Sequence, residues 1–272
     1  MKKDREAIHA GTWYDGTEKA LRARLSKWIT ARSADDGETA LGIVAPHAGY
    51  MYSGEVAASV YNIIKIPKTV LILNPNHRGI GAPLALYPNG NWETPLGNVP
   101  IDSELNSLLL KNCPVTEDDK AHTYEHSGEL QVPFLKFRRN DVSICAISIS
   151  ADEVETMQEL GKGIAVSLKQ FPRDALIVAS SDLTHYEPQD AAEKKDKQAI
   201  AKIEALDPDG LWETVLRERI TMCGVAPVSA MLFAAKELGA KSARLIKYRT
   251  SGDVTGDYDQ VVGYGSLLIK RP

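Results

Sequence analysis

The stretch LGIVAPHAGY, residues 41–50, joins a short, wholly apolar run to a polar segment that contains a histidine. Two further runs are built in the same way, TVLIL at residues 69–73 and ALIVAS at residues 175–180. A strand that helices cover on both faces is apolar at nearly every position. A strand with one face exposed to solvent alternates between apolar and polar residues. The three runs therefore predict buried strands in a largely parallel sheet.

Amphipathic stretches separate apolar runs along the whole chain. Further strands are expected at Val142–Ile149, Ala243–Tyr248 and Val261–Ile269. Apolar residues at helical spacing predict helices at Gly54–Lys65, Asp102–Lys111, Asp152–Gln170, Gln189–Leu206, Gly210–Arg219 and Val225–Leu238. This alternation is typical of an α/β fold whose sheet, largely parallel or mixed, is flanked by helices on both faces. No repeat or linker interrupts it, so residues 1–272 are predicted to form a single domain.

The composition excludes several classes of protein. Hydrophobic residues make up 43% and charged residues 25% of the chain, as in an ordinary globular protein, and the net charge of −4 indicates no nucleic-acid surface. The three cysteines are an odd number without a CxxC pair, which argues against a disulfide framework and fits a reducing compartment. No signal-peptide core or apolar run of about 18 residues is present, so we expect a cytoplasmic protein without a membrane span.

Three histidines lie where predicted strands end. His47, His77 and His185 each follow one of the three apolar runs quoted above by a few residues. A single histidine of this kind is more often an ordinary loop residue, but ligands of open α/β sheets bind beyond the carboxyl ends of the strands. A metal or acid/base centre needs groups that approach one point from several rigid elements. Three such histidines therefore favour one common centre.

A fourth histidine, His126, lies three positions before Glu129 in the segment HTYEHSGE, residues 122–129. One helical turn would bring both side chains to the same pocket. The alternative is that His126 or Ser127 begins a helix, while Glu129 makes a capping contact and points into solvent. We favour a functional role for His126, because Glu125 beside it adds little as a helix-start signal, and leave both interpretations of Glu129 open.

Cys223 directly precedes a predicted helix, within ITMCGVAP, residues 220–227. The positive end of the helix dipole would favour its thiolate, which is the form that binds a metal or attacks a substrate. The alternative is a small buried apolar residue, which is our interpretation of Cys145 inside its strand. Cys113 looks like an ordinary loop residue. A glycine and a proline constrain the loop around Cys223 and favour a placed side chain there.

Asp182 lies three positions before His185, directly after a predicted strand. Its carboxylate could orient the imidazole or cap the following turn. A Ser-His-Asp hydrolase would use Ser180 or Ser181 beside it, but the chain has no GxSxG nucleophile elbow. It also has no GxGxxG motif or P-loop, so the usual dinucleotide and nucleotide sites are not indicated.

Several segments spread along the chain carry a family resemblance. They are HAGTWY (9–14), APHAGYMYSG (45–54), LNPNHRG (73–79), TPLGNVPID (94–102), EHSGELQVPFL (125–135), SSDLTHY (180–186) and CG-x-x-P (223–227). Together they resemble the MEMO family, whose microbial members are called AmmeMemoRadiSam system protein B. The resemblance covers essentially the whole chain. It implies a fold like that of the class III extradiol dioxygenases, non-haem iron enzymes with a metal at the sheet edge.

The resemblance implies a metal centre formed by His47, His77 and Cys223. The dioxygenases bind Fe(II) through two histidines and a carboxylate, so this chain departs from them by offering a thiolate. A thiolate shifts the preference toward softer ions and is itself exposed to oxidation by oxygen. The expected cofactor is therefore a metal ion: iron, copper or zinc.

His126 and His185 match positions near the pocket where the dioxygenases keep acid/base histidines, and Asp182 accompanies His185. These three are the expected catalytic residues. The resemblance thus implies a metal-dependent redox or oxygen-using enzyme that acts on an unidentified small substrate. It also implies a pathway link to a radical SAM protein and to an AMMECR1-type protein.

A binding protein of another class is the alternative. In that interpretation the same pocket holds a peptide or an aromatic ligand, and its apolar walls come from Trp13, Tyr14, Tyr50 and Tyr52. These aromatic residues are also explained by ordinary core packing. Saturable peptide binding that survives metal removal would favour the alternative, whereas metal-dependent turnover of catechol-like compounds would favour the enzyme.

Overall fold

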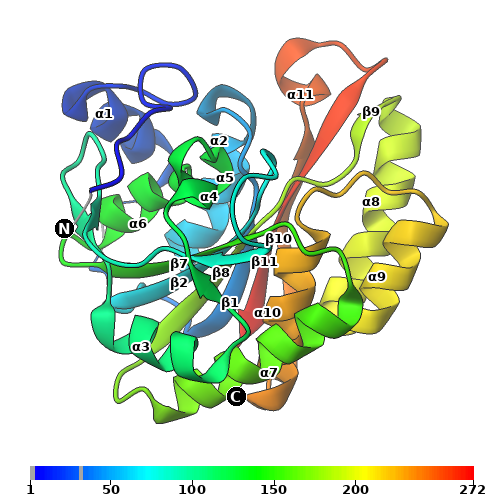
Figure 1. The fold of residues 1–272 in the computed structure, drawn as a ribbon. Helices are drawn as coiled ribbons and strands as arrows, with labels where there is room; N and C mark the ends of the chain where they lie inside the picture. The colour runs from blue at the N-terminus through cyan, green and yellow to red at the C-terminus, as the bar shows by residue number, and fades with distance from the viewer. Residues whose placement is uncertain (1–3, 31–32) are drawn as a thin grey trace.

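The computed structural model describes residues 4–30 and 33–272. Within this part of the chain, one large sheet lies in the middle of the molecule, with helices on both sides (Figure 1). Its strands follow the spatial order β10 (Ala243–Thr250), β11 (Val261–Lys270), β1 (Ala40–Ala45), β8 (Ala175–Ser180), β2 (Thr69–Pro75), β7 (Ser143–Ile149), β3 (Leu84–Leu86) and β6 (Thr116–Glu117). A further strand, β9 (His185–Glu187), pairs with β11. A separate two-stranded sheet consists of β4 (Asn91–Trp92) and β5 (Val99–Pro100).

The centre of the large sheet is parallel. β1 and β2 both run parallel to β8, which lies between them, and β7 runs parallel to β2 on its other side. Toward the edges, β11 is antiparallel to β1, and β3 is antiparallel to β7. The sheet is therefore mixed with a parallel centre, which confirms the predicted α/β class.

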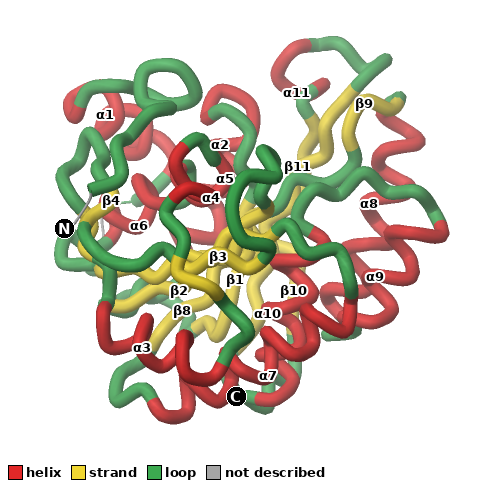
Figure 2. The backbone as a smooth tube through the Cα atoms, viewed as in Figure 1, coloured by secondary structure: helices red, strands yellow, loops and turns green. Residues whose placement is uncertain are grey.

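Helices cover the two faces of the sheet in separate groups. One face carries α1 (Glu18–Trp28), α2 (Tyr50–Ile63) and α6 (Val132–Arg138), and the other carries α3 (Ser103–Asn112), α7 (Val154–Gln170) and α10 (Val225–Glu237) (Figure 1). α8 (Gln189–Glu204) packs against β10 and β11, and α9 (Pro208–Arg217) packs against α8 and α10. The short helices are α4 (Lys120–Thr123), α5 (His126–Glu129) and α11 (Gly252–Thr255). Figure 2 shows α4 and α5 set among loops, apart from the long helices α3 and α7.

Successive side chains of a central strand enter two different cores. In β2, Leu71 and Leu73 join the core under α7 and α10, whereas Val70 and Ile72 join the core under α2 and α6. All four side chains are fully buried. Because both faces of the strand are covered, every position can be apolar, and this explains the continuous runs in the sequence.

The start of α2 differs from the prediction. The helix begins at Tyr50, four residues before the expected start at Gly54. The Tyr50 ring is buried and packs against the rings of Tyr14 and Phe134, so contacts with distant segments determine where the helix begins. Two helices that the sequence pattern did not predict, α1 and α6, complete the cover of this face. None of the described helices is long and apolar enough to cross a membrane.

Candidate functional site

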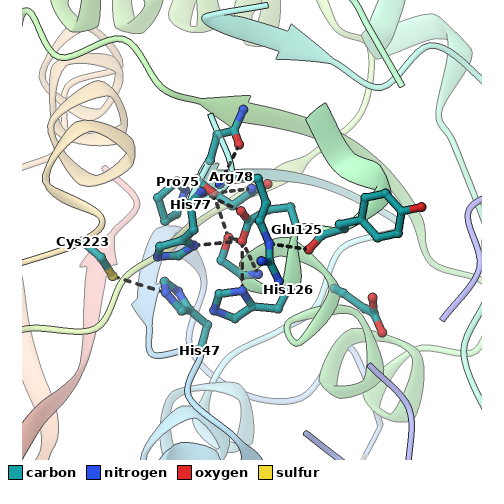
Figure 3. Close-up of polar contacts among 12 residues, drawn as sticks. His47, Pro75, His77, Arg78, Glu125, His126 and Cys223 are labelled. Carbon is teal, nitrogen blue, oxygen red and sulfur yellow. Dashed lines mark hydrogen bonds and ion pairs between the residues drawn. The ribbon is translucent and has the colours of Figure 1, made fainter. Parts of the chain in front are cut away.

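Four of the predicted site residues lie together beyond one edge of the sheet (Figure 3). His47 and His77 follow β1 and β2 by two residues each, His126 begins α5, and Cys223 lies two residues before α10. Because β1 and β2 run parallel on either side of β8, their carboxyl ends deliver both histidines to the same place. The side chains therefore come from four segments that are far apart in the sequence.

His47, His77 and His126 form a tight cluster. One ring nitrogen of each lies within 4.8 Å of the other two. The ring centroid of His47 lies 5.2 Å from that of His77 and 5.3 Å from that of His126. The rings of His77 and His126 stack, with their centroids 4.6 Å apart. Imidazole nitrogens are ligands that iron, copper and zinc accept. The cluster is therefore a group that could hold a metal ion.

The hydrogen bonds of His47 determine which of its nitrogens is free. Nδ1 lies 2.9 Å from the Oγ atom of Ser180. The Ser180 hydroxyl donates its single hydrogen to the Ser127 carbonyl at 2.8 Å and accepts from Gln131 Nε2 at 2.8 Å. Because that hydrogen is already used, His47 must donate from Nδ1. The lone pair of its Nε2 atom then remains available for a ligand.

Glu125 orients the other two histidines. Its Oε1 atom lies 2.9 Å from Nδ1 of His77 and 3.2 Å from Nδ1 of His126 (Figure 3). A carboxylate that accepts from one ring nitrogen leaves the other free to bind a metal. Glu125 also caps α5 by accepting from the N–H of Ser127 at 3.0 Å. The interpretation that Glu125 adds little to the helix start is therefore wrong, and its position directly before the helix was the available signal.

Burial keeps two of these histidines, His47 and His126, neutral. It lowers the pKa of His47 well below the ordinary value and that of His126 to about 3. Burial alone would raise the pKa of Glu125, but the hydrogen bond from His77 and the charge of that ring hold it well below its usual range. A neutral imidazole is the form that binds a metal, so the electrostatics fit a metal centre.

Cys223 reaches the cluster through His47, with its Sγ atom 3.3 Å from His47 Nε2 (Figure 3). Two ligands of one tetrahedral metal ion lie roughly 3.3–3.7 Å apart, so this donor pair fits a shared ion. Burial and the nearby Asp182 carboxylate raise the pKa of the thiol. The expectation that the helix dipole favours the thiolate is therefore wrong for the protein alone, because burial outweighs the dipole. A bound cation would supply the charge that releases the proton.

Asp182 supports His47 and Cys223 instead of His185. Its Oδ1 atom accepts from the His47 backbone N–H at 2.8 Å, and its own N–H donates to Cys223 Sγ at 3.3 Å. His185 begins β9, and its Nδ1 atom donates to the Thr221 carbonyl at 2.9 Å. No hydrogen bond between the described Asp182 and His185 side chains is found, so the structure gives no support to the expectation that this carboxylate orients that imidazole.

Comparison with known proteins identifies the family. The family model described as Memo-like protein matches residues 5–268. The chain belongs to the Memo-like family. It is 41% identical to a MEMO1 family protein of Methanopyrus kandleri, with 98% of this chain and 99% of that protein covered. It is 46% identical to a MEMO1 family protein of Pyrobaculum aerophilum, with 86% of this chain and 85% of that protein covered. These matches confirm the resemblance carried by the sequence motifs.

A solved structure shares the fold of this Memo-like chain. It is an uncharacterized protein from Escherichia coli K12, with a TM-score of 0.53, 14% identity, and coverage of 84% of this chain and 98% of that one. At this identity the likeness concerns the fold alone. The helix-flanked mixed sheet is consistent with the extradiol dioxygenase-like fold that the motifs imply.

Glu129 of the Memo-like chain anchors the N-terminal segment. Its carboxylate accepts from Arg5 Nη1 at 2.8 Å, from the His9 N–H at 3.0 Å and from the Tyr14 hydroxyl at 2.8 Å. The side chain is 1% exposed. His126 does begin a helix, as the alternative predicted, but Glu129 does not point into solvent. Its carboxylate is instead taken up by a buried ion pair with Arg5 and by hydrogen bonds to the N-terminal segment.

The four aromatic residues of the binding alternative gather elsewhere. Trp13, Tyr14, Tyr50 and Tyr52 line a cavity of about 540 Å³ whose lining includes none of the clustered histidines and not Cys223. The cavity of the Memo-like chain nevertheless adjoins the histidine cluster, because the ring centroids of Trp13 and His126 lie 4.3 Å apart. The aromatic walls and the candidate metal ligands thus do not share a single pocket.

Proposed function

We propose that this Memo-like protein holds a transition-metal ion between His47, His77 and Cys223. The observation that carries the proposal is the 3.3 Å distance between Cys223 Sγ and His47 Nε2, beside a histidine cluster whose ring nitrogens lie within 4.8 Å. In the protein alone the Cys223 thiol donates to this nitrogen of His47, and a metal ion would take the place of that hydrogen between the two atoms. Both side chains come from the ends of rigid strands and helices. The hydrogen bonds of Ser180 and Glu125 also support the proposal. They engage the Nδ1 atoms of His47 and His77 and so leave the Nε2 atoms to face a ligand.

The activity we infer is that of a metal-dependent redox or oxygen-using enzyme with a small substrate. When bound, such a metal supplies Lewis-acid or redox chemistry. His126 lies beside both histidine ligands, with its Nδ1 atom held at Glu125, so its other nitrogen is placed to take a proton from a substrate. Asp182 positions the loop of His47 through the backbone N–H. His185 is proposed as a more distant acid/base group at the entrance of the site, partly exposed on β9.

The donor set bears on which metal binds. A thiolate with two imidazoles favours copper or zinc over the iron that two histidines and a carboxylate hold in dioxygenases. Elemental analysis of protein purified without a metal-affinity tag tests the proposal directly. We expect about one equivalent of metal per chain, and a sulfur-to-metal absorption band on titration with Co²⁺ that Cys223→Ser removes. Metal-free protein that fails to bind Co²⁺ or Zn²⁺ under reducing conditions would refute the proposal.

A binding function is the second candidate, and one observation favours it. The cavity of about 540 Å³ carries partly exposed Trp13 and Tyr52 side chains, and aromatic walls of this kind suit a peptide or an aromatic ligand. Binding of such a ligand would be saturable, would weaken in Trp13→Ala, and would survive treatment with a chelator. Dependence of that binding on metal would instead favour the enzyme.

A further inference from the structure

A second cavity opens directly onto the candidate metal ligands. It has a volume of about 410 Å³, and its lining includes His77 and Cys223. The remaining wall is largely apolar and comes from α9, from the start of α10, and from the ends of β2 and β7 with the residues that follow them. α9 contributes Trp212, Val215 and Leu216. The larger cavity near Trp13 has none of these ligands in its lining. The smaller one is therefore where a molecule could meet both the metal centre and an apolar surface.

The fold explains the apolar wall. Trp212, Val215 and Leu216 lie three and four positions apart on α9, so they share one face of the helix. Trp212 and Val215 are buried in the core, whereas Leu216 is 67% exposed. An exposed leucine at the rim of an apolar cavity contributes little to the core, so the position fits contact with a ligand.

Apart from the candidate ligands His77 and Cys223, the polar side chains of this lining are Asn76, Ser150 and Asp152. Ser150 and Asp152 are exposed to solvent. Asn76 is already used, since its Nδ2 atom donates to the Ile80 carbonyl and its Oδ1 atom accepts from the N–H of Gly79. Apart from the candidate ligands, the described lining therefore offers no buried side chain with a free polar group, and an apolar group would be the better occupant of the cavity.

We propose that this cavity binds the apolar body of the substrate, an aromatic or branched aliphatic group, while a carboxylate or phenolate oxygen at its head faces His77 and Cys223. This inference rests on the proposed metal site. The volume of about 410 Å³ falls within the range of small-molecule sites and suits a molecule of about ten non-hydrogen atoms. An anionic oxygen head matches a cation held by neutral imidazoles.

The test uses Co²⁺-loaded full-length protein and three probes: 3-phenylpropionate, acetate and 3-phenylpropanol. We expect 3-phenylpropionate to perturb the Co²⁺ absorption bands at far lower concentration than acetate. Leu216→Ser should weaken its binding about tenfold, the loss typical of removing apolar contact from a pocket, and leave acetate unchanged. Ala226→Leu, which fills the cavity from α10, should weaken it at least as much. Leu110→Ser, an equally simple change at an exposed leucine of α3, is the matched control and should have no effect.

The outcomes separate this inference from the proposed function. If Co²⁺ binds but 3-phenylpropionate and acetate perturb its bands equally, or neither variant weakens the former, the cavity proposal is overturned and the metal site stands. If Co²⁺ does not bind, the neutral 3-phenylpropanol still reports on the cavity through the part of the tryptophan fluorescence that Trp212→Phe removes. A response that Leu216→Ser abolishes would then support the apolar site while refuting the metal. No response in the native protein would overturn the cavity proposal.

Discussion

The Oε1 atom of Glu125 lies 2.9 Å from the Nδ1 atom of His77, across 48 positions of sequence. The other oxygen of the same carboxylate accepts from the His77 backbone N–H at 2.6 Å, so both the ring and its loop are held. Oε1 also lies 3.2 Å from Nδ1 of His126. One buried carboxylate therefore determines which nitrogen two clustered histidines present to the centre of the site.

Glu125→Gln should weaken metal binding by about 10- to 100-fold while leaving the ligands in place, because a carboxamide is a poorer acceptor for two imidazole N–H groups. Competition with a chromophoric Zn²⁺ chelator measures the change. Glu117→Gln, on an exposed edge strand, is the control and should bind like the native protein. An unchanged affinity in Glu125→Gln would show that Glu125 serves only as the cap of α5.

His185→Ala should retain one equivalent of metal but reduce turnover once a substrate is known. The reason is that the Nδ1 atom of His185 donates a hydrogen bond to the Thr221 carbonyl. In addition, no ring contact among the described residues joins His185 to the clustered histidines. His77→Ala should lose the metal. Elemental analysis of both variants side by side decides the matter, and metal lost from His185→Ala but kept in His77→Ala would reverse these assignments.

Cys223→Asp should move metal selectivity toward iron, because a carboxylate is a harder ligand than a thiolate. The native protein should bind Cu(I) or Zn(II) at least as well as Fe(II). It should also show little ring cleavage of simple catechols when loaded with iron without oxygen and then exposed to it. Rapid, iron-dependent formation of a yellow ring-opened product by the native protein would contradict this expectation and restore a dioxygenase activity as the first choice.

Glu129→Ala should lower the free energy of unfolding by about 3–5 kcal/mol, because it leaves the buried Arg5 guanidinium without its carboxylate. Urea unfolding followed by circular dichroism measures this loss. Glu18→Ala removes an exposed ion pair with Arg22 and should leave the midpoint unchanged within error. Equal effects of the two substitutions would mean that the buried pair contributes no more than a surface pair.

Asp102→Asn should lower the free energy of unfolding by about 1–2 kcal/mol at pH 7. Burial alone would raise the pKa of Asp102, but hydrogen bonds from the Thr69 hydroxyl and the Leu105 N–H outweigh it and lower the pKa. Since the folded pKa lies below the unfolded value near 3.8, the charged form contributes stability above that pH. The advantage of the native protein should disappear as the pH falls through the folded pKa. Urea unfolding between pH 2 and 7 tests this, with the exposed Asp141→Asn as control.

The fold and the convergence of two histidines could be predicted from local pattern. Apolar runs at residues 69–73 and 175–179 have no wet face, so they can only be central strands under two layers of helix. Parallel neighbours end at the same edge, and His47 and His77 follow such strands by two residues. Both features depend on residues that are adjacent in the sequence, and for that reason they could be predicted before the structure was known.

The partners of the site residues were decided only by the tertiary structure. Glu125, Ser180 and Asp182 acquire their roles from groups that lie between 2 and 135 positions away, and most of those groups arrive on other strands or helices. The hydrogen bonds of a side chain depend on which donors and acceptors the fold places next to it. The spacing of residues along the chain does not contain this information. The thiol state of Cys223 follows the same rule, because burial against Asp182 outweighs the helix that follows it.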